Sequence, residues 1–302
     1  MIINMLNSLA GIKKIPYFPE HVTLNRKHIS DHDLDADFPI NPTAYQMLKE
    51  VDGKKDELEI AEALKGVFNV REEVLQKDLH ELLTGLNRRY LINWRYGEGP
   101  SFAGVLYQFF SQYHIRYKER FSSHSDSFLL LYIKFLQVIS KKIIVFWLVF
   151  LMLSLAAYTV VPDGSIVGIA AYFSVVYFGL ITGTALHEVV HGIAHRKAAG
   201  RNGPQGFLAA DMMSVKFVRP VMSLHDKRSI WITALGPLVP GVLGIAGVLF
   251  TVFFLKENAV SVGVLLFFST YALHMMYLLP FMGDGKSIMK QLMIRGIGGK
   301  SS

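Results

Sequence analysis

Residues 164–186 read GSIVGIAAYFSVVYFGLITGTAL, and residues 187–191, which follow directly, read HEVVH. The first segment carries no formal charge, and it exceeds the roughly 20 apolar residues that cross a bilayer as a helix. Ionisable side chains are costly inside a membrane, so a charged motif at the end of such a helix points to function. The two segments together predict a membrane protein with a polar site at one end of a span.

The spacing of the two histidines in this motif suits a metal ion. Residues four apart on a helix lie on one face, one turn above another. His187 and His191 can therefore bind one Zn²⁺ through neutral ring nitrogens, and Glu188 can take a proton from water on the metal. We predict His187 and His191 as metal ligands and Glu188 as the general base.

The composition supports a membrane protein. Hydrophobic residues make up 51% of the chain and the mean hydropathy is +0.32, which is too apolar for an average soluble enzyme. The net charge is +7, but the basic residues mostly flank apolar runs, so we expect no nucleic acid partner. The absence of cysteine excludes disulfides, cysteine-ligated metals and a cysteine nucleophile. The apolar residues 1–12 precede Lys13 and Lys14, the reverse of a secretory signal, so we expect a retained N-terminus.

Four apolar segments have the length of membrane spans. They are residues 143–161, 164–186, 229–255 and 258–283. Basic residues concentrate in the segment 196–228 and in the tail from Lys286, whereas the opposite loops hold only Lys256. Positive charge stays on the cytoplasmic side, so both termini and the long loop are expected in the cytoplasm.

Residues 1–96 predict a small winged-helix-like domain. Asn41 is a good N-cap and Pro42 suits the first helical position, so a helix should begin here and run to Val51. The acidic stretch 31–37 is expected to be a solvated loop. Two further amphipathic helices and two flanking strands complete the domain. The helices are expected over residues 57–68 and 71–88, and the strands over residues 21–25 and 90–94.

Parts of this domain resemble a known family. The run NPTAYQMLKEVDG at residues 41–53, LEIAEAL at 58–64 and the segment 79–92 are similar to PqqD-like domains. Such domains bind the leader peptides of ribosomally made, modified peptides. The resemblance implies that a leader is held as an added strand in the groove beside the helix 71–88. A generic winged helix serving as a cytosolic regulatory module is the alternative.

Residues 97–140 are expected to link this domain to the spans. The segments 102–121 and 128–139 are rich in aromatic and basic residues, and neither has an uninterrupted apolar run long enough to cross a bilayer. They are typical of helices that lie in the headgroup region. A soluble helical hairpin that packs on the first domain is the alternative.

A zinc ion held by two histidines needs a third protein ligand and an open position. Asp284, in the run LLPFMGDGK at residues 278–286, is the candidate because it should lie at the same membrane depth as His187. Pro280 and the glycines beside Asp284 would break the helix and aim the carboxylate inward. An aspartate in an ordinary helix-end turn is the alternative.

The other histidines fit less well. His195 lies about 12 Å along the helix from His187, which is too far to share one metal, so a structural or interfacial role is expected. His225 falls in the cytosolic loop, and His274 in the fourth span, where a hydrogen-bonded packing role is expected.

These motifs resemble the site-2-protease family of intramembrane zinc metalloproteases, in which HExxH on one span is paired with a Pro…Asp-Gly motif on another. The run ALGPL at residues 234–238 is also similar to the Gly-Pro helix of that family. The resemblance covers about residues 140–290. It implies one zinc per chain, with His187, His191 and Asp284 as ligands and Glu188 as general base.

The match departs from the family pattern in places that concern contacts with the substrate backbone. Tyr277 stands where an asparagine is common, the spacing from Pro280 to Asp284 is short by one residue, and a second asparagine is replaced around Pro240. Residues 203–224 could form a hairpin with an exposed edge to which an extended substrate adds as a strand. A basic loop on the membrane surface is the alternative.

The expected fold is an α-helical polytopic membrane protein with about four transmembrane helices and a small α+β winged-helix-like N-terminal domain. The expected parts are a PqqD-like cytosolic domain (1–96), interfacial linker helices (97–140), a transmembrane zinc metalloprotease domain (141–290) and a cytosolic tail (291–302).

The expected function is intramembrane zinc endopeptidase activity on a ribosomally made, modified peptide precursor, for maturation or export. The layout resembles membrane peptidases of epipeptide-type, bacteriocin-like clusters, which implies a bacterial cell membrane. Expected partners are the leader-bearing precursor, the lipid bilayer, and a peptide-modifying enzyme or exporter of the same pathway. The alternatives are a regulatory protease that releases a membrane-anchored transcription regulator, and a non-catalytic membrane protein that binds the peptide for immunity.

Overall fold

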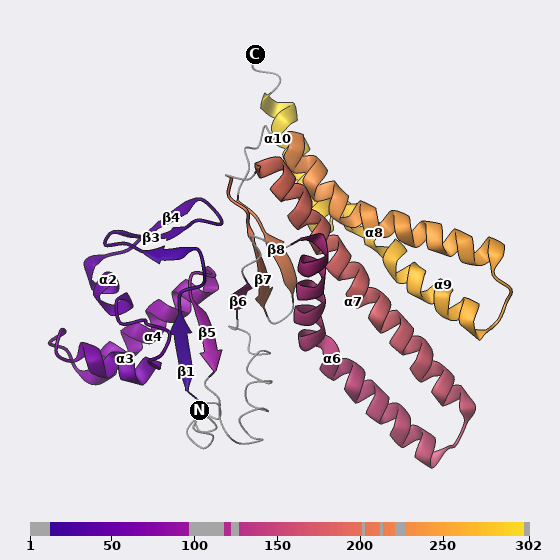
Figure 1. Ribbon diagram of the computed structural model, residues 1–302, viewed down its shortest axis with the longest axis horizontal. Coiled ribbons are helices and arrows are strands. Elements are labelled where there is room, and N and C mark those ends of the chain that lie inside the picture. The colour runs from indigo at the N-terminus through magenta and orange to yellow at the C-terminus, as the bar shows by residue number, and fades with distance from the viewer. Residues whose placement is uncertain are drawn as a thin grey trace. The chain divides into compact units, whose positions relative to one another are not determined.

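The computed structural model describes residues 13–96, 118–121, 127–200, 203–211, 214–220 and 227–298 (Figure 1). The chain divides into two compact units. The first consists of residues 1–124 together with 204–220, and the second of residues 125–203 together with 221–302. The segment between the second and third long helices therefore belongs to the N-terminal unit.

In the described residues of the first unit the helices are α2 (Pro42–Leu48), α3 (Glu57–Leu64) and α4 (Glu72–Arg88). The predicted start of the first helix is confirmed, because the Asn41 side chain accepts a hydrogen bond from Ala44 N at 2.7 Å and Pro42 opens the helix. Helix α3 begins with a capping box between Asp56 and Glu59. Local capping chemistry thus sets where α2 and α3 begin.

Two small antiparallel sheets flank these helices. Strand β1 (Lys14–Tyr17) pairs with β5 (Asn93–Tyr96), which joins the two ends of the domain. Strands β2 (Val22–Leu24), β3 (His28–Asp31) and β4 (Ala36–Pro39) form a meander in which β2 and β4 are the edges. The acidic stretch 31–37, expected as a loop, therefore consists of the end of β3, the turn 32–35 and the start of β4.

The core of this unit lies between α4 and the meander. Helix α4 buries leucines at helical spacing, and they pack in one cluster with Ile29 of β3 and Ile60 of α3. The α4 members are Leu75, Leu79, Leu83 and Leu86. Burying a leucine side chain contributes about 1.5–3 kcal/mol, so this helix face is a principal source of stability in the unit.

A third sheet joins distant parts of the chain. Strand β7 (Phe207–Asp211) lies between β6 (Lys118–Phe121) and β8 (Val215–Val218), all antiparallel. Strands β7 and β8 therefore form a hairpin within the segment 203–224, as one of the two interpretations of that segment predicted, and β8 is an edge of the sheet. The expectation of helices throughout 97–140 is wrong for β6, while residues 97–117 and 122–126 lie outside the described part of the chain.

A buried ion cluster ties β6 to the meander. The Arg120 guanidinium donates to both carboxylate oxygens of Asp31, at 2.6 and 2.8 Å, and to Asp33 at 2.6 Å. It also stacks on the Phe207 ring at 3.8 Å, and the three charged side chains are almost fully buried. The prediction of a solvated acidic loop is thus wrong for Asp31 and Asp33, whose counter-charge comes from the presumed linker.

The second unit is helical. Helices α6 (Phe128–Val160) and α7 (Gly164–Ala199) form one antiparallel hairpin, and α8 (Lys227–Phe254) and α9 (Ala259–Ala272) form another (Figure 1). Four helical stretches of the described chain are long and apolar enough to cross a membrane, which confirms the polytopic fold class. The expected interfacial segment 128–139 is not separate, because α6 runs through it without a break.

The fourth span is interrupted. Helix α9 ends at Ala272, a 3₁₀ turn η1 covers Leu273–Leu278, and α10 (Gly283–Gly298) begins after Pro280. The break predicted from Pro280 is present, and it starts earlier, at Leu273. Helix α10 also extends through residues 291–298, which were expected to form a tail. Asp284 consequently lies in the first turn of a new helix.

Candidate metal centre

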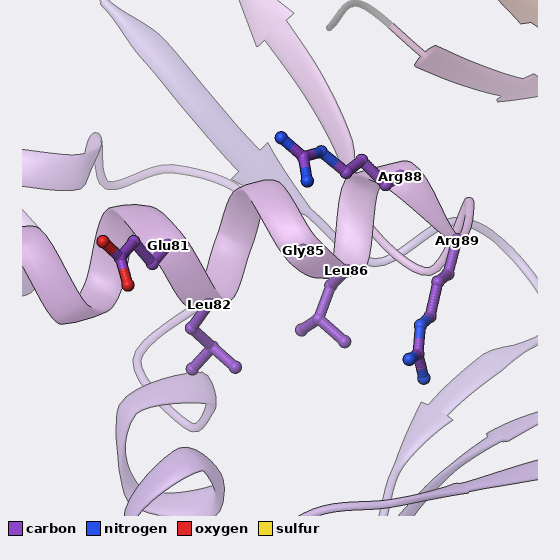
Figure 2. A pocket seen from close by; sticks show the side chains of 6 residues that line it. All are labelled: Glu81, Leu82, Gly85, Leu86, Arg88 and Arg89. Atoms are coloured by element: carbon purple, nitrogen blue, oxygen red, sulfur yellow. The ribbon is translucent and has the colours of Figure 1, made fainter.

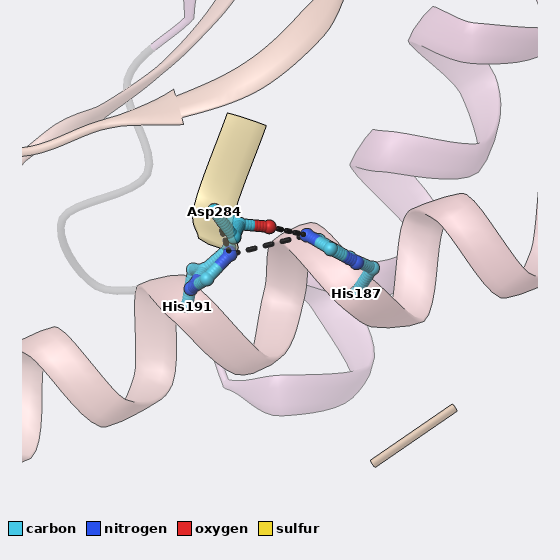
Figure 3. Close-up of side chains that lie close together, drawn as sticks. All are labelled: His187, His191 and Asp284. Carbon is cyan, nitrogen blue, oxygen red and sulfur yellow. Dashed lines mark hydrogen bonds and ion pairs between the residues drawn. The ribbon is translucent and has the colours of Figure 1, made fainter. Parts of the chain in front are cut away.

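Helix α7 and the start of α10 bring together the three predicted ligands. His187 and His191 lie one turn apart on α7, and both are buried. Their Nε2 atoms are 3.1 Å apart, and the Asp284 carboxylate lies 3.0 Å from the first and 3.6 Å from the second. Figure 3 shows the two rings and the carboxylate pointing toward one another. Among the described residues, their ligand atoms form a group within 4.8 Å of one another.

These distances fit a zinc ion. Four-coordinate zinc with bonds of about 2.0–2.1 Å places its ligand atoms about 3.3 Å apart along the edges of a tetrahedron. The two Nε2 atoms, 3.1 Å apart, and Oδ2 of Asp284, 3.0 Å from Nε2 of His187, are near that value, while the 3.6 Å contact with His191 is made by the other carboxylate oxygen, Oδ1. Two imidazoles and one carboxylate are also a common catalytic zinc set, which leaves a fourth position open. The donor set and its geometry therefore fit the metal that the motif predicts.

His191 is held in a ligating orientation by α8. Its Nδ1 lies 2.8 Å from the carbonyl oxygen of Ile232, and a carbonyl can only accept, so Nδ1 carries the proton. The Nε2 lone pair is then available at the cluster. Gly236 leaves room for this ring, because a Cβ at position 236 would overlap it. The Gly-Pro run that the sequence singled out thus packs directly against a predicted ligand.

Asp284 is positioned by a tight backbone turn. Met282 N donates to Leu279 O at 2.9 Å, and Lys286 N donates to Met282 O at 2.7 Å. A Cβ at Gly285 would collide with the carbonyl oxygens of Leu278 and Leu279, so only glycine fits there. The carboxylate therefore projects from a helix N-terminus, where negative charge is favoured.

The remaining predicted residues lie near the centre or apart from it. Glu188 follows His187 on α7, is half-buried and is not a member of the ligand group. His195 is buried one turn beyond His191 and is also outside the group. His225 lies outside the described residues. His274 is buried, and its ring centroid is 5.6 Å from that of His187, a proximity that sequence spacing did not reveal.

A second candidate site lies on the N-terminal unit. A pocket of about 440 Å³ opens along the last turns of α4, the helix beside which a leader groove was expected. Figure 2 shows Leu82 and Leu86 pointing to the same side of the helix, with Arg89 beside them. The complete lining is Glu81, Leu82, Gly85, Leu86, Arg88 and Arg89. An apolar floor with charged residues around it suits a peptide that carries both kinds of side chain.

Comparison with known proteins identifies one part of the chain. Residues 21–92 match the family model of the coenzyme PQQ synthesis protein D (PqqD). This confirms the PqqD-like resemblance of the N-terminal domain, and it implies binding of a peptide precursor. No curated protein and no solved structure matches the chain. The match includes α4 and its pocket, whereas the metal centre lies outside it.

Proposed function

We propose that this protein is an intramembrane zinc endopeptidase that cleaves a ribosomally made, modified peptide precursor. The observation that carries the proposal is the convergence of His187, His191 and Asp284 at zinc-ligand spacing, with Glu188 beside the first ligand. Peptide-bond hydrolysis needs a Lewis acid and a general base in one place, and this arrangement provides residues for both.

The roles of the residues follow from their chemistry. His187, His191 and Asp284 would hold the zinc ion, which when bound supplies Lewis-acid stabilisation of the charge that develops on the scissile carbonyl oxygen. Glu188 accepts a proton from the attacking water as the new C–O bond forms. It then donates that proton to the amine nitrogen as the C–N bond breaks. The half-buried position of Glu188 suits a base that meets both water and substrate.

The N-terminal unit would recruit the precursor through its leader. The PqqD match over residues 21–92 and the α4 pocket support this role. Strand β4 is an edge of its sheet, so a leader could add to it by main-chain hydrogen bonds. Recruitment of this kind raises the local concentration of substrate without changing the chemical step.

The setting we propose is a bacterial cell membrane with both termini in the cytoplasm. Basic residues cluster in the segment 196–228 and after Lys286, while the opposite loops are nearly free of them. Reporter fusions at Asp163 and Glu257 should report the outside. A fusion after Lys290 should report the cytoplasm, and an outside readout there would contradict this topology.

The function is tested by co-expressing the chain with peptide precursors encoded beside its gene and following the peptides by mass spectrometry. The wild-type chain should shorten one of them, and Glu188→Gln should not, while both retain about one zinc per chain. Glu257→Gln, which removes an exposed carboxylate in the loop between α8 and α9, is the matched control and should cleave normally. Cleavage by Glu188→Gln at the wild-type rate would remove the proposed base.

A further inference from the structure

The two histidine ligands differ in what their second ring nitrogen contacts. The Nδ1 of His191 donates to Ile232 O, whereas the Nδ1 of His187 is buried without a hydrogen-bond partner among the described residues. Metal-ligating histidines almost always donate their second N–H to an acceptor, which sets the tautomer and the orientation of the ring. The second nitrogen of His191 thus has its acceptor on α8, whereas the second nitrogen of His187 lacks one among the described residues.

His274 has the chemistry to supply that acceptor. Its Nδ1 lies 3.2 Å from the carbonyl oxygens of both Thr270 and Tyr271, near the end of α9. Because those carbonyls can only accept, Nδ1 carries the proton, and in the neutral ring Nε2 is left with a lone pair. The ring is only 4% exposed, so the nitrogen that presents this lone pair belongs to the protein interior.

Packing against α7 holds the His274 ring near His187. A Cβ at Gly183 would lie 2.7 Å from Cε1 of His274, so the absence of a side chain there admits the ring. Gly183 is one helical turn before His187, and side chains on a helix lean toward the preceding turn. The His187 ring therefore extends over the turn that His274 packs against.

The spacing of the two rings is close to that of a hydrogen-bonded pair. An N–H···N bond of about 2.9 Å places two imidazole centroids about 5 Å apart, and the observed separation is 5.6 Å with a tilt of 47°. We propose that Nε2 of His274 accepts the Nδ1–H of His187 and is the positioning residue that holds this ligand for the metal. This inference rests on the zinc site of the proposed function.

The first test measures zinc affinity rather than cleavage. The full chain carrying Glu188→Gln is purified in detergent, and its zinc dissociation constant is determined by competition with a chelator. His274→Phe keeps a ring but removes the acceptor, so the dissociation constant should rise about 10- to 100-fold. His274→Gln places an amide oxygen near the position of Nε2 and should recover most of the loss. Equal affinity in the His274→Phe and parent proteins would overturn the inference.

Two control variants separate positioning from packing. Tyr277 also places its ring beside His187, with the centroids 5.2 Å apart, and Tyr277→Phe should leave zinc affinity unchanged. Gly183→Ala displaces His274 without altering it and should weaken zinc binding. Gly168→Ala makes the same change on α7 where a Cβ meets nothing within 4 Å, and it should have no effect. A loss in Tyr277→Phe equal to that in His274→Phe would contradict the assignment.

A spectroscopic readout distinguishes a positioning residue from a ligand. In protein loaded with Co²⁺, the visible spectrum should keep its shape and intensity in His274→Phe, because the ligand set is unchanged. An altered spectrum would make His274 itself a ligand and overturn the inference. A chain that binds no zinc in a His187-dependent manner would overturn both this inference and the proposed function, whereas equal affinities with and without His274 overturn this inference alone.

Discussion

The ring of His191 occupies the space in which residue 236 would carry a side chain, because Gly236 presents bare backbone to it. The ring is anchored at the same time by Ile232 O, so it cannot move aside without losing that hydrogen bond. We predict that Gly236→Ala lowers zinc occupancy sharply while the chain still inserts and folds. Metal analysis of the purified protein measures this, with Gly168→Ala as the control. Full zinc occupancy in Gly236→Ala would show that the ring tolerates displacement.

A substitution in the α4 pocket is predicted to raise the stability of the helix and to lower its affinity for the leader peptide. Gly85 lines the pocket, and a Cβ there meets nothing within 4 Å. Gly85→Leu should stabilise the helix by about 0.5–1 kcal/mol, since glycine is a poor helix former. It should also weaken binding of the leader peptide at least tenfold by filling the pocket, as titration calorimetry would record.

The matched control for this variant is Gly66→Leu. Gly66 is equally open but lies outside the pocket, in the turn after α3. Peptide binding by Gly66→Leu should equal that of the wild-type chain. If Gly85→Leu binds the leader as tightly as this control does, the leader does not use the α4 pocket.

The buried ion cluster predicts a large stability loss. Arg120 supplies a positive charge to the buried carboxylates of Asp31 and Asp33, and removing it breaks both ion pairs. Breaking a buried pair in this way costs about 3–5 kcal/mol. Arg120→Ala should therefore lower the unfolding free energy of the first unit by that amount. Urea titration followed by the fluorescence of Trp94, with the other two tryptophans replaced, would measure it.

An exposed ion pair provides the comparison for Arg120→Ala. Lys65 pairs with Glu62 and Glu72 at the surface, and such pairs contribute about 0–1 kcal/mol. Lys65→Ala should accordingly change the urea midpoint little. Equal losses in the two variants would show that the cluster at Arg120 contributes no more than a surface contact.

An isolated fragment of residues 13–96 lacks β6 and therefore Arg120. It should be unstable because it loses the ion pairs of Arg120 with Asp31 and Asp33.

Alkaline pH should destabilise the first unit through Tyr90. Burial raises the pKa of Tyr90 to about 12, and the nearby charge of Asp211 acts in the same direction. The folded state thus holds the phenolic proton more tightly than the unfolded state, whose pKa is about 10. This contribution to stability is complete below pH 10 and is lost as the pH rises through 12. The urea midpoint should fall less between pH 9 and 11.5 in Tyr90→Phe than in the wild-type chain.

Parts of the fold and site that depend on local spacing could be predicted from the sequence. The four-residue spacing of His187 and His191 decides that they share a helix face, and the apolar runs decide the number of spans. Asp284 could be proposed because a zinc site needs a third ligand and because two helix ends at one membrane depth can meet. Each of these predictions used only a helical repeat and a count of residues.

Contacts between distant segments could not be predicted in this way. A run of aspartates reads the same whether it is solvated or paired with a buried arginine, and the partner of Asp31 lies 89 positions away. The interruption of the fourth span at Leu273 also carries no strong signal, since no proline or glycine stands there. The approach of His274 to His187 depends on Gly183, whose role appears only when two helices are packed together.

The first unit is built from two segments that are far apart in the sequence, and this affects how it folds during synthesis. The guanidinium of Arg120 stacks on the ring of Phe207. Both helices of the α6–α7 hairpin are translated after Arg120 and before Phe207. At about 5–20 residues per second, that delay is on the order of 10 s. The peptide-recognition unit therefore completes its third sheet only after two helices have left the ribosome for the membrane. A nascent chain that stalls before β7 would carry an N-terminal unit without its third sheet.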